Sequence, residues 1–245
     1  MIAFINQMNN SIKIIAKELS MLLSGKCIAE IINLETDNIY NKSATSNIIK
    51  KYIDKNYTYG IDMIHRQNIR LKFISVNPEY KCYEAMSFSS RSLFYIIGED
   101  WNSEKEQPYL KKQLNFTYIF IPIIKIKKKE VFDHYTEWLI GNISVWKPNL
   151  NELKLIGEEW SINKKIISNG VKIISVKHGK TFRNKNNLPK MSNSHYIHLR
   201  PHGKNGFDYD TKYLEHKGIE ITKQSFWLNK TFINDLLKLY RWQMT

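Results

Sequence analysis

The chain has 245 residues, of which 42% are hydrophobic and 13% aromatic, so a packed core is expected and overall intrinsic disorder is excluded. The 37 Lys and Arg against 23 Asp and Glu give a formal net charge of +14, which favours a polyanionic partner such as nucleic acid. A second explanation stays open, because 31 of the 37 basic residues are Lys, as AT-rich codons would also produce. No run of about 18 apolar residues predicts a membrane span.

The N-terminus and the cysteines indicate the compartment. The first ten residues have no basic segment, no long apolar segment and no small-residue cleavage site, so no export signal is predicted. Cys27 and Cys82 are the only cysteines and have no CxxC spacing, so neither a disulfide framework nor a cysteine zinc site is predicted. We expect a soluble cytoplasmic protein.

The opening third of the chain has helical patterns. Apolar residues recur at helical spacing after Ser11, which predicts a helix over residues 11–25 that ends at Gly25. Shorter helices are predicted over residues 27–32 and 46–55. Residues 1–60 are therefore expected to form a helical lobe.

Strand patterns begin at residue 68. The alternation in residues 68–76 predicts a strand, and residues 81–88 are expected to return as the second strand of a hairpin. Residues 116–126 are rich in β-branched and aromatic residues and predict a strand suited to a sheet interior. Pro122 in that strand argues for a bulge or an edge position.

The second half mixes both patterns. A helix is predicted over residues 150–169, stopped by Gly170, and a mobile basic loop over residues 178–194. Short strands at 196–200 and 225–228 precede a closing helix that begins at Asn229. Since no repeat or Pro/Gly-rich linker interrupts the chain, residues 1–245 are interpreted as one mixed α/β domain, with a mixed-sheet core over residues 61–245.

Three histidines suggest a metal site, but their spacing argues against it. His195, His198 and His202 form an HxxHxxxH pattern. Residues three apart on a strand point to opposite faces, and Pro201 with Gly203 prevents a helix from bringing the three together. No metal site is predicted.

Five segments, in chain order, carry a resemblance to a known family: IRLKFISV (69–76), YEAMSF (83–88), NLPK (187–190), HLRPHGKN (198–205) and TKQSFWLNKTFI (222–233). They resemble the MutH family, which joins the mismatch-repair nicking enzyme MutH to the Sau-type restriction endonucleases that cut at GATC. The resemblance covers residues 19–237, and its last two segments are the most specific. It implies a restriction-endonuclease-like α/β fold, with a mixed β-sheet flanked by helices in two lobes around a DNA cleft.

The resemblance also locates the positions that are catalytic in active members. Their strand carries Glu-x-Lys, preceded by Asp seven residues earlier, and an upstream helix supplies another Glu. The two strand residues share a face about 6.6 Å apart, so Glu holds magnesium while Lys orients water. Here Arg70 stands at the Glu position beside Lys72, Lys50 at the helix Glu, and Asp62 lies eight residues before Arg70. These degenerate positions are expected to attract phosphate and bind no metal.

A silent active site is typical of the C-terminal copy in Sau-type enzymes, which binds a second recognition site and stimulates cleavage. The resemblance therefore implies a non-catalytic allosteric (effector) domain of a type II restriction endonuclease that recognises GATC in double-stranded DNA. Its expected partners are that DNA, a catalytic MutH-like domain in the same or another chain, and a second copy in a homodimer. No cofactor is expected for this domain, since magnesium is required only by an active site here or in the partner domain.

The resemblance implies a DNA-binding set centred on Arg200, Pro201, His202 and Gly203, which match an Arg-Pro-Lys-Gly-like loop that recognises bases. Arg200 can donate to guanine O6 and N7, and His202 departs from the family's lysine. The further DNA-binding positions are Lys42, Lys190, Lys204, Lys223, Gln224 and Trp227. Each has a structural alternative, and Trp227 is equally consistent with a core residue.

Two other functions stay open. The first is an active magnesium-dependent endonuclease with a rearranged site that uses Asp62, Glu79 or Glu84. The second is a general cationic binder of RNA or a membrane surface, which would show no preference for GATC.

Overall fold

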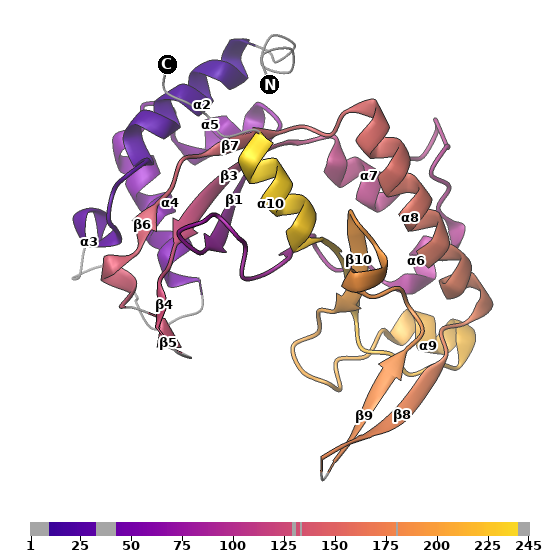
Figure 1. The fold of residues 1–245 in the computed structure, drawn as a ribbon. Helices are drawn as coiled ribbons and strands as arrows, with labels where there is room; N and C mark the ends of the chain where they lie inside the picture. The colour runs from indigo at the N-terminus through magenta and orange to yellow at the C-terminus, as the bar shows by residue number, and fades with distance from the viewer. Residues whose placement is uncertain (1–9, 33–42, 129–130, 133, 180, 240–245) are drawn as a thin grey trace. The chain divides into compact units, whose positions relative to one another are not determined.

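The computed structural model describes residues 10–32, 43–128, 131–132, 134–179 and 181–239, and shows a mixed α/β protein (Figure 1). Its internal contacts divide the chain into two compact units. Unit 1 comprises Met1–Glu84, Phe116–Lys147 and Ile233–Thr245, and unit 2 comprises Ala85–Asn115 and Pro148–Phe232. Residue 60, where the helical lobe was expected to end, lies within unit 1. None of the described helices is both long and apolar enough to cross a membrane.

Unit 1 contains a mixed four-stranded sheet. Strand β1 (Ile69–Val76) pairs in parallel with β3 (Thr117–Ile124), and β3 pairs antiparallel with β6 (Leu139–Ile140) and β7 (Ser144–Trp146). Strand β3 lies between these partners and is buried almost throughout, which confirms the predicted interior strand.

Pro122 lies in β3 without making it an edge strand. The Pro122 carbonyl accepts a hydrogen bond from the Gly141 N–H, on the side where β6 ends and β7 has not begun. Because the N–H that proline lacks would point to the same side, its absence falls at this break between the two partner strands.

Helices cover one face of this sheet. The predicted opening helices are confirmed as α2 (Asn10–Leu23), α3 (Ile28–Ile31) and α4 (Ala44–Asn56), and the sequence patterns missed α5 (Gly60–Arg66). Buried residues of α2, α4 and α5 form one apolar core with residues of the sheet such as Ile119 (Figure 1). A short hairpin of β4 (Lys127–Lys128) and β5 (Val131–Phe132) and the turn η1 (Tyr135–Glu137) complete the described part of unit 1, apart from its share of α10.

Unit 2 is built around a three-stranded antiparallel sheet. Strand β11 (Gln224–Leu228) lies between β10 (Ile197–Pro201) and β2 (Met86–Ser87). The expected hairpin over residues 68–88 is wrong in its second half, because β2 pairs with β11 and only the isolated bridge between Val76 and Cys82 returns to β1.

Helix α8 (Leu150–Asn169) anchors the sheet of unit 2. Its predicted bounds are confirmed, and Asn149 and Glu152 close its first turn as a reciprocal capping box. The Glu159 carboxylate accepts backbone hydrogen bonds from His195, Tyr196 and Ile197, which fixes the start of β10. The remaining helices are α6 (Leu93–Gly98), α7 (Tyr109–Leu114), α9 (Thr211–Lys217) and α10 (Lys230–Leu239), the last of which confirms the predicted closing helix and crosses into unit 1.

The loop predicted over residues 178–194 is wrong. Strands β8 (Ile173–His178) and β9 (Thr181–Asn186) pair in register as a hairpin that projects from unit 2, and the turn η2 (Met191–Asn193) follows (Figure 1). Most of the described side chains in this ribbon are exposed or half-buried. Because the described side chains on both faces are exposed or half-buried, the ribbon needs no alternation of apolar and polar residues, which is the pattern by which a strand is recognised.

Candidate nucleic-acid interface

Arg200, His202 and Trp227 come together at the end of β10. Trp227 pairs with His198 across β10 and β11, and this register places Arg200 diagonally opposite the indole. The Arg200 guanidinium carbon lies 4.5 Å from the Trp227 ring centroid, and the His202 and Trp227 ring centroids are 5.3 Å apart. Arg200 and His202 are exposed, whereas Trp227 is half-buried. The arginine is thus supported on one face by the indole, and the residue remains exposed.

Asp208 braces the loop that follows Pro201. Its carboxylate accepts a hydrogen bond from the Lys204 backbone N–H at 2.9 Å and forms an ion pair with the Lys223 ammonium at 2.6 Å. The Lys223 hydrogen bond, followed by that from Lys204, lowers the pKa of Asp208 below its usual range. Lys223, predicted to contact phosphate, is therefore engaged within the protein, while the Lys204 side chain is exposed.

Gly203 is required by close packing in this loop. A Cβ atom at this position would lie 2.8 Å from Thr222 Cγ2 and 3.0 Å from Asp208 Cβ. His202 is held nearby through its backbone N–H, which donates to the Lys223 carbonyl at 2.8 Å. The loop between β10 and α9 is consequently tied to the segment that leads into β11.

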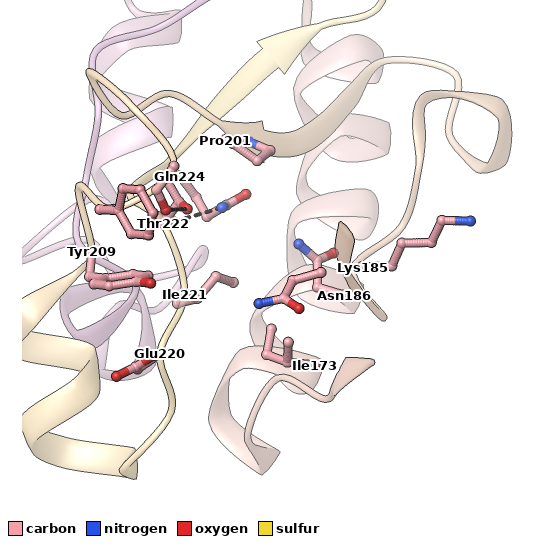
Figure 2. A pocket seen from close by; sticks show the side chains of 12 residues that line it. Ile173, Lys185, Asn186, Pro201, Tyr209, Glu220, Ile221, Thr222 and Gln224 are labelled. Atoms are coloured by element: carbon pink, nitrogen blue, oxygen red, sulfur yellow. Dashed lines mark hydrogen bonds between the residues drawn. The ribbon is translucent and has the colours of Figure 1, made fainter. Parts of the chain in front are cut away.

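Gln224, the first residue of β11, is buried and lines a pocket of about 340 Å³ (Figure 2). Its side chain is only 1% exposed, and its Nε2 donates to the Thr222 carbonyl at 2.7 Å. Its Oε1 is buried and, among the described residues, has no hydrogen-bond partner. Pro201, Tyr209 and Asn186 lie around the same pocket. The predicted role of Gln224 as a phosphate contact would require this buried side chain to move.

Two other predicted DNA-binding positions are Lys190 and Lys42. Lys190 is exposed at the start of η2, where its carbonyl accepts a hydrogen bond from the Ser194 hydroxyl. Lys42 lies outside the described residues.

The three histidines of the HxxHxxxH pattern have different surroundings. His198 is buried and its Nδ1 is hydrogen-bonded to Asn229 Oδ1, whereas the His195 ring packs against Tyr196. Burial lowers the pKa of His198, although the hydrogen bond that Nδ1 donates to Asn229 Oδ1 acts in the opposite direction. In the described part of the chain, no group of three or more His, Cys, Asp or Glu could hold a metal ion.

In unit 1, three of the positions predicted to be degenerate catalytic residues, Lys50, Arg70 and Lys72, lie near His65. We call these four basic residues the β1 cation cluster. Arg70 and Lys72 lie on β1, Lys50 on α4 and His65 on α5. Burial, then the charges of Arg70 and Lys50, lower the pKa of Lys72. Burial and the charge of Arg70 likewise lower the pKa of His65. The structure thus brings Lys50, Arg70 and Lys72 within electrostatic reach of one another.

Arg70 is held in a defined orientation within the β1 cation cluster. Its guanidinium carbon lies 3.9 Å from the Phe116 ring centroid, and its Nη1 donates to the carbonyls of Ile69 at 3.2 Å and His65 at 3.4 Å. The sequence patterns did not single out Phe116. Only the parallel register of β1 and β3, which pairs Ile69 with Thr117, would have shown that Phe116 lies near Arg70.

The acidic residues considered for an active site are dispersed. Asp62 is exposed on α5, and its charge raises the pKa of His65, against the larger lowering effects of burial and Arg70. Glu79 lies in the exposed turn after β1, and Glu84 is exposed further along the chain.

The sequence was also compared with known proteins. No protein-family model matches the chain, and no curated protein matches it.

Proposed function

We propose that this chain recognises GATC in double-stranded DNA, as the non-catalytic effector domain of a MutH/Sau-type type II restriction endonuclease. The observation that carries this proposal is the support of Arg200 by Trp227 beside His202, on an exposed and braced strand end. The proposal is also supported by the resemblance carried by residues 198–205 and 222–233. These two segments resemble the family most specifically, and they contain the neighbouring strands β10 and β11 of unit 2.

Arginine is suited to sequence recognition because its planar fork can donate to both O6 and N7 of guanine in the major groove. The indole of Trp227 restricts the guanidinium to one plane, which reduces the entropy lost when both hydrogen bonds form. His202 can present a ring nitrogen to a neighbouring base. The net charge of +14 adds affinity for any sequence through counterion release.

The finer fold assignment belongs to the same proposal. A parallel pair of strands extended by antiparallel partners and covered by helices is compatible with a restriction-endonuclease-like core. The proposed partners are duplex DNA, a catalytic MutH-like domain and a second copy of this chain. No cofactor is assigned to the chain itself, in line with the cationic residues at positions 50, 70 and 72.

Gel-shift titration of GATC and scrambled duplexes at two salt concentrations tests the proposal. Arg200→Ala should weaken GATC binding by about 1–3 kcal/mol and reduce the sequence preference, because the guanine contacts are lost. Lys105→Ala removes one exposed charge from a turn of unit 2 and is the matched control, which should retain the preference. Equal losses of Arg200→Ala on both duplexes would refute base recognition.

Plasmid incubation with magnesium separates the effector from an active nuclease. The purified chain should leave GATC plasmid uncut. Nicking that disappears in Asp62→Ala would instead establish a rearranged active site. Equal affinity of the unaltered chain for GATC and scrambled DNA would favour a general cationic binder.

A further inference from the structure

Gln224 leaves a buried hydrogen-bond acceptor at the wall of a pocket within unit 2. We call this the Gln224 pocket, which is lined by Gln224, Tyr209 and residues of the β8–β9 hairpin. Gln224 is 1% exposed, and no described residue donates to its Oε1. Its Nε2 donates one hydrogen to the Thr222 carbonyl at 2.7 Å and carries a second. Because a buried acceptor without a donor is unfavourable, this amide is suited to a ligand that supplies an N–H group.

The walls of the Gln224 pocket suit a flat ring. Figure 2 shows Tyr209 and Gln224 on one side of the pocket, with Ile173 and Asn186 facing them from the hairpin. Ile221 adds apolar surface to the side of Tyr209. An aromatic ring and apolar side chains with a few polar groups are the usual lining of a site for a small organic molecule.

The charges and the size of the Gln224 pocket limit the ligand further. The charged residues of its described lining are Lys185 and Glu220, which are both exposed and have opposite signs. Their charges offset each other, so the lining favours neither an anion nor a cation. The volume of about 340 Å³ lies at the lower end of the range for small-molecule sites, about 300–1,000 Å³. The pocket therefore fits a small, neutral molecule.

The backbone holds Tyr209 and Gln224 in place relative to each other. Tyr209 forms an isolated antiparallel bridge with Thr222, two residues before Gln224. Gln224 in turn pairs with Pro201 across β10 and β11. The aromatic ring and the amide are therefore positioned before a ligand binds, which reduces the entropy lost on binding.

We propose that the Gln224 pocket binds a single nucleobase that carries an amino group, such as adenine. The amino group donates to Gln224 Oε1, and the second hydrogen of Nε2 is donated to the neighbouring ring nitrogen, as glutamine pairs with N6 and N7 of adenine. Tyr209 offers the aromatic surface against which the base packs. This site goes beyond the proposed function, because Arg200 and Trp227 are not among its described lining residues. Two sources supply such a base: a free nucleoside, or a nucleotide turned out of a DNA duplex.

Calorimetric titration with adenosine tests the site in the full-length chain. The unaltered chain should show saturable binding, and Gln224→Met, which keeps the side-chain length but removes the amide, should weaken it about tenfold. Purine riboside lacks the amino group of adenosine and should bind the unaltered chain about tenfold more weakly. Because both changes remove the same hydrogen bond, their effects should not add. Purine riboside that binds as tightly as adenosine overturns the inference.

A pair of variants on β8 keeps the inference testable if Gln224→Met does not fold. Ile173→Trp fills the pocket while leaving Gln224 in place. Ile174→Trp is the matched control, because neighbouring residues of a strand point to opposite faces and Ile174 is 61% exposed. Adenosine binding should be lost in the first variant and kept in the second. Equal binding by the two variants, or no binding of millimolar adenosine to the unaltered chain, overturns the inference.

Duplex DNA that contains the fluorescent base 2-aminopurine distinguishes the two sources. Its fluorescence increases when the base leaves the stack. An increase on binding to the unaltered chain that is absent with Ile173→Trp supports a base supplied by DNA. Unchanged fluorescence in a chain that binds adenosine supports a free nucleoside. A chain that binds adenosine but does not prefer GATC supports the pocket and refutes the proposed function, whereas the reverse result overturns the pocket alone.

Discussion

Arg70 in unit 1 and Arg200 in unit 2 both lie over an aromatic ring, but their surroundings differ. The guanidinium of Arg70 is half-buried among other cations, and two backbone carbonyls hold it. Arg200 is exposed at a strand end, beside a loop in which Asp208 pairs with Lys223. A concentrated positive charge suits a phosphate, whereas a single supported arginine suits the edge of a base. The charge around the arginine, more than the cation–π contact, distinguishes the two expected roles.

Replacing the support of Arg200 should have the largest effect on sequence preference. Trp227→Leu keeps an apolar side chain but removes the flat surface that orients the guanidinium. We expect the preference for GATC over scrambled duplex to fall by about 1–3 kcal/mol, measured by competitive gel shift. A thermal melt of the same preparation controls for folding. An unchanged preference would show that the indole does not position Arg200 for recognition.

Moving the loop after Pro201, which Asp208 holds in place, should have the next largest effect on sequence preference. Gly203→Ala would place Cβ 2.8 Å from Thr222 Cγ2, so the loop must shift and carry His202 with it. The GATC preference should drop several-fold, measured in the same assay. Gly206→Ala is the matched control, because a Cβ there meets nothing within 4 Å. Equal behaviour of the two variants would mean that the loop's position does not matter for recognition.

The corresponding change in unit 1 should act on affinity alone. Phe116→Leu removes the ring beneath Arg70 while keeping a half-buried apolar residue. Affinity should fall by about 0.5–1 kcal/mol on GATC and scrambled duplexes equally, as determined by fluorescence anisotropy. A loss confined to the GATC duplex would assign unit 1 a part in sequence recognition and abolish the contrast between the two arginines.

The smallest expected effect is the pH dependence of the stability contributed by the Asp208–Lys223 ion pair. Because the pKa of Asp208 is lowered in the folded protein, its ion pair stabilises the fold above the usual Asp pKa of 3.8. That stabilisation should be lost as the pH falls through the lowered value. Denaturant unfolding of the unaltered chain and Asp208→Asn should therefore differ most near neutral pH and converge in acid. A difference that persists below the lowered pKa would contradict this explanation.

The predictable elements are those whose signals are local. Helix α8 has a capping residue at Asn149, apolar spacing and a terminal Gly170, and all three signals lie within the element itself. The short helices α6, α7 and α9 have few turns in which a period could appear, so they were missed. Helix α9 depends on a distant group, because the carboxylate of Asp210, which caps it, also accepts the backbone N–H of Leu93.

The candidate site shows the same division between local and long-range information. The order of residues along the chain was enough to place Arg70 and Lys72 on one face of β1, because alternation is a property of the strand itself. The contact of Arg200 with Trp227, the burial of Gln224 and the packing of Phe116 against Arg70 depend on strand register and loop closure. Such contacts join residues separated by about 25 or more positions, and no local propensity encodes them.

By itself, the sequence determined the large positive charge, the principal strands and longer helices, and the presence of cations at positions 50 and 70. Tertiary structure alone decided which aromatic rings lie against Arg70 and Arg200 and that Lys223 forms an ion pair with Asp208. It also decided that a polar segment forms the β8–β9 hairpin. The physical reason is that charge and periodicity belong to residues and short segments. Pairing and burial arise only when segments far apart in the chain pack together.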